Sequence, residues 1–454
     1  MLLLLLFIFS AKWNIASQEG SLGRFQEVFA WKQLTYDVNG HLLLHDRFGS
    51  PTGADKRSDD QIIFETDDVE DEGWNSRPPN DDSGLNDQNI PNPNDEAGRF
   101  FVQYNNIPMG VEKVDDMLFI TVPRRRYGIL STLNYIDLKE VHTKSPALRP
   151  YPSIWESRAV TSVYRTRADK CGRLWMVDTG LMEIPGNPQQ VQQPAIVIFD
   201  LNRHKQILRY PLKSSDIPTA NTPTGLASIT IDIGEGCDDA YAYIPDITTF
   251  GIIVFSLRRH DSWRHSHVYF HFNPTASNLY IAEQSFQWND GVFSITLTEP
   301  GPDGCRKVYF HPMISTQEFS VSSCVLKNNT IMSRSNYFTF YSIVGDRGSH
   351  AQSTMHGFDP NTRVIFYADI GRDALSCWNT DLPLQPSNIG ILAQDTRKLS
   401  YPSDLHVTDD EVWVMVNTLP RFSYSRLNKN EYNFYVYRGK VRDLISGTVC
   451  STYY

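Results

Sequence analysis

Polar side chains close a recurring apolar segment at four places along the chain. Asp178, Asp246 and Asp369 each end such a segment, and Asn417 stands at the matching place in a fourth. Carboxylates that converge on one point attract a cationic ligand, and a carboxylate can also remove a proton from a substrate. These residue types therefore predict amine binding or proton-transfer chemistry at one shared site.

A structural interpretation of the same residues stays open. An Asp that follows a strand often caps the next turn by accepting hydrogen bonds from backbone N–H groups. For any single Asp this is the simpler explanation, so the prediction of a site depends on the whole set. Within it, Asp178 and Asp246 are our candidate catalytic residues and Asp369 is a candidate ligand contact, while Asp290 stands just before its segment.

Three histidines alternate in a second cluster that could do chemistry. His265, His267 and His271 would share one face of an extended strand, and imidazoles so placed could bind zinc or copper. No fourth ligand is evident beside them, and a solvent-facing strand is the commoner explanation. We therefore expect no bound metal.

The remaining motifs argue against other reaction classes. The run 124–126 is three consecutive arginines, which is too short for a basic patch, and we expect one of them to project inward. The chain lacks a Gly-rich phosphate loop at a strand–helix junction, and it has no Gly-x-Ser-x-Gly elbow. The sequence thus argues against nucleotide use and serine hydrolysis, and we expect no cofactor.

A repeat of short strands must position the polar residues. Six apolar or aromatic segments recur at a mean interval of about 60 residues, with Gly, Pro, Asn and Asp between them, which is typical of a β-propeller. The segments lie at residues 118–123, 174–178, 241–246, 291–295, 364–369 and 412–417. The sequence therefore predicts an all-β, six-bladed propeller whose innermost strands surround a central channel. Its alternative, a β-sandwich, fits the regular interval and the number of segments less well.

One apolar strand precedes the first repeat. Residues 27–34 have no repeat of their own, so we expect this strand to complete the last blade and close the ring. Closure matters because an open ring leaves unpaired strand edges. We divide the chain into a signal peptide (1–17), a segment with the ring-closing strand (18–50), an acidic insertion (51–98) and the propeller (99–454).

The acidic insertion carries a net charge of −11, slightly more than the −10 of the whole chain. Residues 51–98 hold 14 acidic and 3 basic side chains together with many prolines, so the rest of the chain is near neutral. Such a composition cannot bury enough apolar surface to fold, and we expect this insertion to be disordered. Because no basic face is indicated, we expect no nucleic-acid partner.

The N-terminus and the cysteines indicate an extracellular protein. The apolar run at residues 2–9 is too short for a membrane span and is followed by small residues at Ala16 and Ser17, as in a signal peptide. We therefore expect secretion and no membrane contact. The six cysteines are an even number, as expected for disulfides, and 15 pairings are open from the sequence alone. Asn328 opens an Asn-x-Thr glycosylation motif.

Several motifs together resemble the insect yellow / major royal jelly protein family. They cover residues 106–111, 122–126, 171–180, 194–201, 377–379 and 401–404. The resemblance extends over about 25–50 and 98–450, and the acidic insertion departs from it. It implies a six-bladed propeller. It also implies the disulfides Cys171–Cys237 and Cys377–Cys450, which leaves Cys305 and Cys324 as an additional pair.

The resemblance implies two kinds of function. Members of the family resemble dopachrome-converting enzymes of melanin and cuticle pigmentation, whereas others are extracellular binders of biogenic amines. The first would need a base and a donor to the quinone oxygen, and the second a carboxylate or amide beside an aromatic wall. Ser403, Asn417 and Phe422 lie in stretches similar to the ligand-contacting part of the amine binders. Both functions imply a small aromatic amine or dopachrome-like partner, and a structural protein with a vestigial channel is a third alternative.

Overall fold

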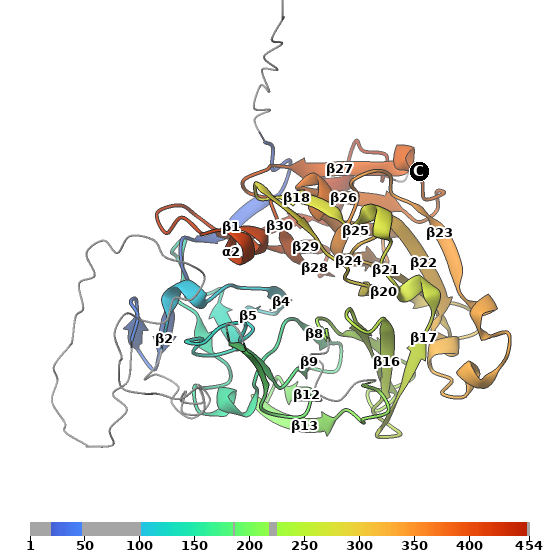
Figure 1. Cartoon of the computed structure of the whole chain (residues 1–454), viewed down its shortest axis with the longest axis horizontal. Coiled ribbons are helices and arrows are strands. Elements are labelled where there is room, and N and C mark those ends of the chain that lie inside the picture. Colours follow the sequence, from blue (N-terminus) through green and yellow to red (C-terminus); the bar gives the residue numbers. More distant parts are fainter. Residues whose placement is uncertain (1–19, 48–100, 185–186, 218–224, 452–454) are drawn as a thin grey trace, which may run out of the picture.

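Six four-stranded antiparallel sheets form a ring (Figure 1). The computed structural model describes residues 20–47, 101–184, 187–217 and 225–451. The acidic insertion and the predicted signal peptide lie outside the described residues.

Blades 1 to 3 follow each other along the chain. Blade 1 consists of β4 (Gly110–Val114), β5 (Met117–Thr121), β6 (Leu133–Asp137) and β7 (Arg149–Pro150). Blade 2 consists of β8 (Thr166–Asp169), β9 (Arg173–Asp178), β12 (Ala195–Asp200) and β13 (Lys205–Pro211). Blade 3 consists of β14 (Thr230–Ile233), β15 (Ala240–Asp246), β16 (Gly251–Ser256) and β17 (Asp261–Ser266).

Blades 4 to 6 complete the ring. Blade 4 consists of β20 (Val292–Pro300), β21 (Arg306–Pro312), β22 (Gln317–Ser322) and β23 (Ser342–Asp346). Blade 5 consists of β24 (Ser353–Asp359), β25 (Val364–Asp369), β26 (Ala374–Asn379) and β27 (Ile389–Gln394). Blade 6 consists of β28 (Pro402–Thr408), β29 (Glu411–Val416), β30 (Phe434–Lys440) and β1 (Gln26–Trp31).

The inner strands surround the axis, and the core lies between the blades. Each of β4, β8, β14, β20, β24 and β28 contacts the next one around the ring. The second and third strands are largely buried, and in Gly251–Ser256 every residue is buried. The predicted six-bladed, all-β fold is confirmed.

The N-terminal strand closes the ring as predicted. Strand β1 pairs antiparallel with β30, with Trp31 opposite Phe434 and Gln26 opposite Arg438. The last blade thus joins the two ends of the propeller, and every blade has four strands. This pairing removes the open edges that an incomplete ring would expose.

The repeat is out of register at its fourth copy. Five of the six segments are second strands, but residues 291–295 lie at the beginning of β20, an inner strand. The second strand of blade 4 is β21, which ends on His311 and Pro312 and has no terminal Asp. Our repeat was wrong here because the apolar start of β20 imitates a second strand. The acids that end the segments therefore follow second strands, and they do not lie on the inner strands.

All six cysteines form disulfides. The bonds are Cys171–Cys237, Cys305–Cys324 and Cys377–Cys450, and no cysteine is free. The pairs that the resemblance implied are therefore present. Within the described part of the chain, no helix is both long and apolar enough for a bilayer crossing.

Candidate active site

The axis of the propeller is closed by ion pairs instead of lined by free acids. The Arg165 side chain, from the start of blade 2, donates to the carbonyl oxygens of Ser403 at 3.1 Å and Ala227 at 2.8 Å. Two residues further along the chain, the Arg167 guanidinium lies 2.9 Å from the Asp404 carboxylate and 3.4 Å from the Glu112 carboxylate. Both carboxylates are fully buried and compensated, so this part of the channel offers no uncompensated negative charge to a ligand.

Asp178 is held by a full set of hydrogen bonds. It is completely buried at the end of β9. Its carboxylate accepts from the backbone N–H groups of Thr161 at 3.0 Å, Ser162 at 2.8 Å and Gly180 at 3.1 Å, and from Arg209 at 3.0 Å. These bonds tie the connection from blade 1 to the second strand of blade 2.

Asp246 has an equivalent environment at the end of β15. Its buried carboxylate accepts from the backbone of Gly225 at 3.3 Å, from the hydroxyls of Thr248 and Thr249, and from Arg264 at 3.1 Å. Asp178 and Asp246 thus each have partners from their own blade and the adjoining connection. Among the described residues, no hydrogen bond or ion pair joins these two acids to each other.

Asp369 and Asn417 hold the corresponding loops of blades 5 and 6. Asp369 pairs with Arg372 at 3.1 Å, and burial raises its pKa to about 6 although Arg372 opposes the shift. The Asn417 amide donates to the Pro108 carbonyl at 2.6 Å, and its side-chain oxygen accepts from the Leu419 backbone at 3.0 Å.

Ser403 and Phe422 lie nearer to the axis. The Ser403 hydroxyl donates to the Met109 carbonyl at 2.8 Å, between blades 6 and 1. Phe422 is buried in α2 (Leu419–Tyr424), and the Arg126 guanidinium lies 3.9 Å from its ring centroid. Its ring centroid lies 5.8 Å from that of Tyr104.

A further acid, Asp290, has an environment that suits proton transfer. It lies partly buried two residues before the inner strand β20, and the buried Tyr401 directly precedes the inner strand β28. Burial raises the pKa of Asp290 to about 6, and the Arg125 guanidinium partly opposes this. Burial also raises the pKa of the Tyr401 hydroxyl, whereas Arg165 and Arg125 lower it. We call this end of the channel, with Asp290, Tyr401 and Arg125, the mouth.

Aromatic side chains form one wall of the mouth. They come from the hairpin of β18 (Asn278–Ile281) and β19 (Gln284–Gln287) and from α2, which contacts β19. Phe286 stacks on Tyr424 with a centroid distance of 5.0 Å, and the Trp288 indole N–H donates to the Tyr424 hydroxyl at 2.6 Å. Trp288 meets the Tyr401 ring edge-on at 6.0 Å. A planar aromatic ligand would find both a π surface and polar groups here.

The three consecutive arginines separate into three environments. Arg124 is buried and donates to the carbonyl oxygens of Ile129 at 3.3 Å and Val160 at 3.0 Å, so the inward-projecting arginine that we expected is present. Arg125 acts on Asp290 and Tyr401, and Arg126 lies on Phe422. Asp290 and the three arginines stood out in the sequence, but we did not assign them to one site. The position of Asp290 just before an inner strand was the one signal that could have indicated the mouth.

The alternating histidines are structural, and our solvent-facing interpretation was wrong. His265 is completely buried and bonds the Leu326 carbonyl at 3.0 Å, while His267 stacks on Tyr341 at 4.2 Å. His271 lies beyond the strand against Phe250 at 4.5 Å. The strand ends at Ser266, so the alternation does not continue along one face.

The mouth has the groups that a proton transfer needs. A carboxylate with a pKa of about 6 is ionised at neutral pH and remains a useful base, because its conjugate acid forms close to the working pH. Tyr401 keeps its proton and can donate to a developing oxyanion, and Arg125 provides positive charge for an acidic substituent.

Comparison with known proteins agrees with the fold and identifies relatives. The family model "Major royal jelly protein" matches residues 161–450. "L-dopachrome tautomerase yellow-f" of Drosophila melanogaster is 44% identical over 359 residues, which cover 77% of this chain and 83% of that protein. "Dopaminechrome tautomerase" of the same fly is 34% identical over 367 residues, covering 77% and 78%.

Solved structures resemble this chain only weakly. Virginiamycin B lyase from Staphylococcus aureus superposes with a TM-score of 0.39 at 10% sequence identity, over 74% of this chain and 96% of that one, and this likeness carries no argument about function. The family match and the identity to yellow-f are decisive, and they confirm the resemblance seen in the motifs: the chain belongs to the yellow / major royal jelly protein family.

Proposed function

We propose that this protein is a secreted tautomerase of dopachrome-like aminochromes in the melanin pathway, with Asp290 as its base. The observation that carries the proposal is the mouth. There a carboxyl group with a pKa of about 6 lies next to Arg125 and beside an aromatic wall. The similarity to two aminochrome tautomerases supports the same reaction class.

The proposed reaction moves one proton and changes no oxidation level overall. Asp290 takes a proton from the ring carbon of the aminochrome, and the C–H electron pair moves into the ring to make it aromatic. The quinone oxygen takes a proton from water, Asp290 releases its proton to water to regenerate the base, and a hydrogen bond from Tyr401 would stabilise the negative charge as it develops. Arg125 would attract a substrate carboxylate, and Trp288 and Tyr424 would hold the ring by stacking.

A dopachrome decay assay on the mature protein tests this proposal. Absorbance follows dopachrome loss, and chromatography identifies the indole product. We expect Asp290→Asn to lower kcat/KM by about 10²–10⁴-fold, which is the usual contribution of a general base. A variant that keeps wild-type turnover would remove Asp290 from the mechanism.

The assay needs controls among the other acids. Asp178→Asn and Asp246→Asn test the two candidate catalytic residues that we selected from the repeat in the sequence. Because both acids are saturated by structural hydrogen bonds, we expect their loss to affect folding and not the turnover of folded protein. Loss of turnover in a folded Asp178 or Asp246 variant would move the base to that residue. Asp369, Ser403, Asn417 and Phe422 remain proposed ligand contacts, tested by KM in the same assay.

Non-catalytic amine binding is the second candidate function. The Asp290 carboxylate and the rings of Phe286, Trp288 and Tyr424 would also suit an aromatic amine, because the acid would attract the ammonium and the rings would stack on the ligand. Calorimetry with dopamine and serotonin separates the two functions. Binding heat without dopachrome turnover favours the binder, and turnover favours the enzyme.

Secretion and glycosylation belong to the same proposal. Three disulfides suit an oxidising compartment. Asn328 is partly exposed, and its side-chain oxygen accepts from the Thr330 hydroxyl at 2.9 Å. Cleavage before the described residues and a glycan at Asn328 are both checked by mass spectrometry of protein from the culture medium, before and after glycosidase treatment.

A further inference from the structure

One hydroxyl group on the aromatic wall of the mouth is available to a ligand. The Trp288 indole N–H lies 2.6 Å from the Tyr424 hydroxyl, and because an indole can only donate, the Tyr424 oxygen is the acceptor. The Tyr424 hydroxyl therefore keeps its own hydrogen for another partner. Within residues 20–47, 101–184, 187–217 and 225–451, no acceptor bonds to this hydrogen.

The Tyr424 side chain is open to solvent. It is the last residue of α2, and 41% of its surface is exposed. Phe286 already stacks on its ring with a centroid distance of 5.0 Å, so the hydroxyl is the polar group that this side chain offers to a ligand. A polar group placed on an otherwise apolar wall is typical of a residue that orients a bound small molecule.

The wall that carries Tyr424 is held in place at its other end. The Arg421 guanidinium of α2 lies 3.1 Å from the Glu283 carboxylate, in the turn of the β18–β19 hairpin. The two turn residues, Ala282 and Glu283, have φ angles of 52° and 65°, which residues other than glycine adopt where their surroundings hold them. The hydroxyl is thus presented by a preorganised surface, and little freedom is lost when a ligand binds.

The same indole contacts Tyr401, the proposed donor to the quinone oxygen. The Trp288 ring meets the Tyr401 ring edge-on at 6.0 Å, and it lies 6.5 Å from the Tyr424 ring. Burial raises the pKa of the Tyr401 hydroxyl, and Asp290 and Tyr424 raise it further. The two phenols and the acid therefore lie around one indole, where a single aromatic ligand would meet all of them.

An aminochrome gives such a ligand two oxygens on adjacent ring carbons. Tyr401 serves one of these oxygens in the proposed reaction. The second oxygen needs a donor of its own, because an oxygen that is desolvated without a hydrogen bond costs free energy. Donation by the Trp288 N–H polarises the Tyr424 hydroxyl, which makes it a stronger donor in turn.

We propose that Tyr424 is a specificity-determining residue whose hydroxyl donates to the second of two adjacent ring oxygens. The mouth then selects aromatic ligands with two neighbouring oxygens over monophenols. Trp288 is a positioning residue for this bond, because it acts through Tyr424. The inference rests on the proposed function in taking the mouth as the ligand site, and it holds for an enzyme and for a binder alike.

Calorimetry of the mature protein with dopamine and tyramine tests this selectivity. The two amines carry the same ammonium group and differ by one ring hydroxyl, so the ratio of their dissociation constants reports on the second oxygen. We expect the wild type to bind dopamine about 5–10-fold more tightly than tyramine, and Tyr424→Phe to abolish this preference by weakening dopamine alone. A wild type without the preference, a Tyr424→Phe variant that keeps it, or no binding heat with either amine overturns the inference.

The role of Trp288 is tested by a double-mutant cycle. Trp288→Phe keeps an aromatic ring but removes the N–H, so we expect the preference for dopamine to fall about 2–3-fold. In the Tyr424→Phe background the same substitution should leave the ratio of dissociation constants unchanged. A further change in the double variant would show that Trp288 does not act through Tyr424. Circular dichroism and Tm verify that each variant is folded.

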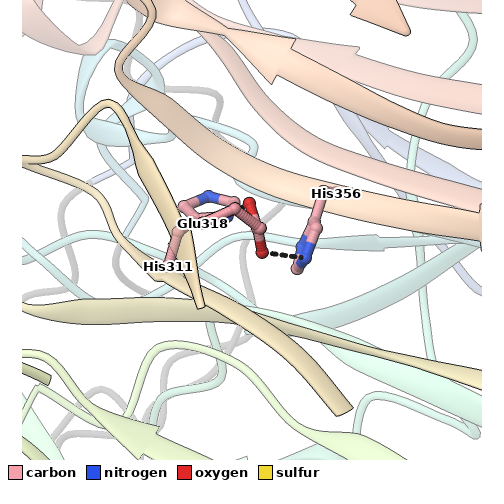
Figure 2. A group of neighbouring side chains, drawn as sticks. All are labelled: His311, Glu318 and His356. Atoms are coloured by element: carbon pink, nitrogen blue, oxygen red, sulfur yellow. Dashed lines mark hydrogen bonds and ion pairs between the residues drawn. The ribbon is translucent and has the colours of Figure 1, made fainter. Parts of the chain in front are cut away.

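The control comes from a buried cluster that joins blades 4 and 5. There Glu318 accepts from Arg347 at 2.8 Å. The same carboxylate lies 3.1 Å from His311 and 3.2 Å from His356 (Figure 2). Tyr367 stacks on His356 at 5.7 Å and is completely buried, so a ligand cannot reach its hydroxyl. Tyr367→Phe is therefore the same chemical change outside the mouth, and it should keep the wild-type preference for dopamine.

The dopachrome decay assay distinguishes failure of this inference from failure of the proposed function. Dopachrome turnover without a preference for dopamine over tyramine would keep the tautomerase and overturn the role of Tyr424. A preference that depends on Tyr424, in a protein without turnover, would keep that role and reject the tautomerase.

Discussion

The rim loops and the mouth hold carboxylates in opposite states. In the rim loops, which follow β9 and β15, Asp178 and Asp246 are fully buried and accept hydrogen bonds from several backbone and arginine donors. At the mouth, Asp290 is only partly buried, and burial raises its pKa to about 6. A carboxylate saturated by donors stabilises the fold, whereas a carboxyl group whose pKa burial raises towards neutral is suited to proton transfer.

The largest expected effect concerns the rim loops. Asp178→Asn leaves three backbone N–H groups and Arg209 with one acceptor oxygen, so we expect the free energy of unfolding to fall by about 3–5 kcal/mol. Urea unfolding measures it. Asp200→Asn is the matched control, because Asp200 also ends a strand and accepts from the backbone of Asn202 at 2.9 Å but in an exposed turn. An equal fall in the free energy of unfolding for Asp178→Asn and Asp200→Asn would show that the buried hydrogen bonds of Asp178 do not stabilise the fold more than those of an exposed turn.

At the mouth, we expect the substitution of the acid to raise the free energy of unfolding instead of lowering it. The folded pKa of Asp290 lies above its ordinary value of 3.8, so the folded state binds this proton more tightly than the unfolded state. The contribution of this bound proton to the free energy of unfolding is fully present below pH 4 and is lost as the pH rises through about 6. We therefore expect Asp290→Asn to raise stability at pH 7 by about 1–3 kcal/mol in the same urea experiment. A destabilised variant would show that the carboxylate has stabilising partners.

The pH profile sharpens the comparison further. If Asp290 is the base, it must be ionised, so kcat/KM should be constant above pH 6 and fall about tenfold per pH unit below it. Stopped-flow dopachrome decay between pH 4.5 and 8, corrected for the spontaneous reaction, gives this profile. A profile without an inflection near pH 6 would show that the ionisation of Asp290 does not control the reaction rate.

Tyr401 should give the smallest effect. Among the residues that the structure describes, its hydroxyl bonds only the Met313 sulfur, weakly, at 3.8 Å, so Tyr401→Phe should keep stability within about 1 kcal/mol. We expect kcat to fall about tenfold with little change in KM, because the lost hydrogen bond forms with charge that develops in the transition state. An unchanged kcat would assign the donor role to Arg165 or to water.

The site was less predictable than the fold. The spacing of apolar segments and the strand at residues 27–34 were sufficient for the six blades and their closure, because propeller blades repeat the same burial pattern locally. The four polar residues were equivalent in the repeat, as predicted. However, equivalent residues of a repeat lie at equal distances around the axis of the ring, and the repeat does not determine whether that distance is short enough for them to share a site.

Sequence alone determined the ring, its closure, the family and the cysteine content, since each depends on local pattern or on composition. The tertiary structure decided which acids are neutralised, because Arg209 and Arg264 reach Asp178 and Asp246 only after the strands have paired. It also brought Asp290, Arg125 and Tyr401 together from three blades, and His311, Glu318 and His356 from two. Charge compensation and desolvation depend on neighbours in space, which one-dimensional spacing does not contain.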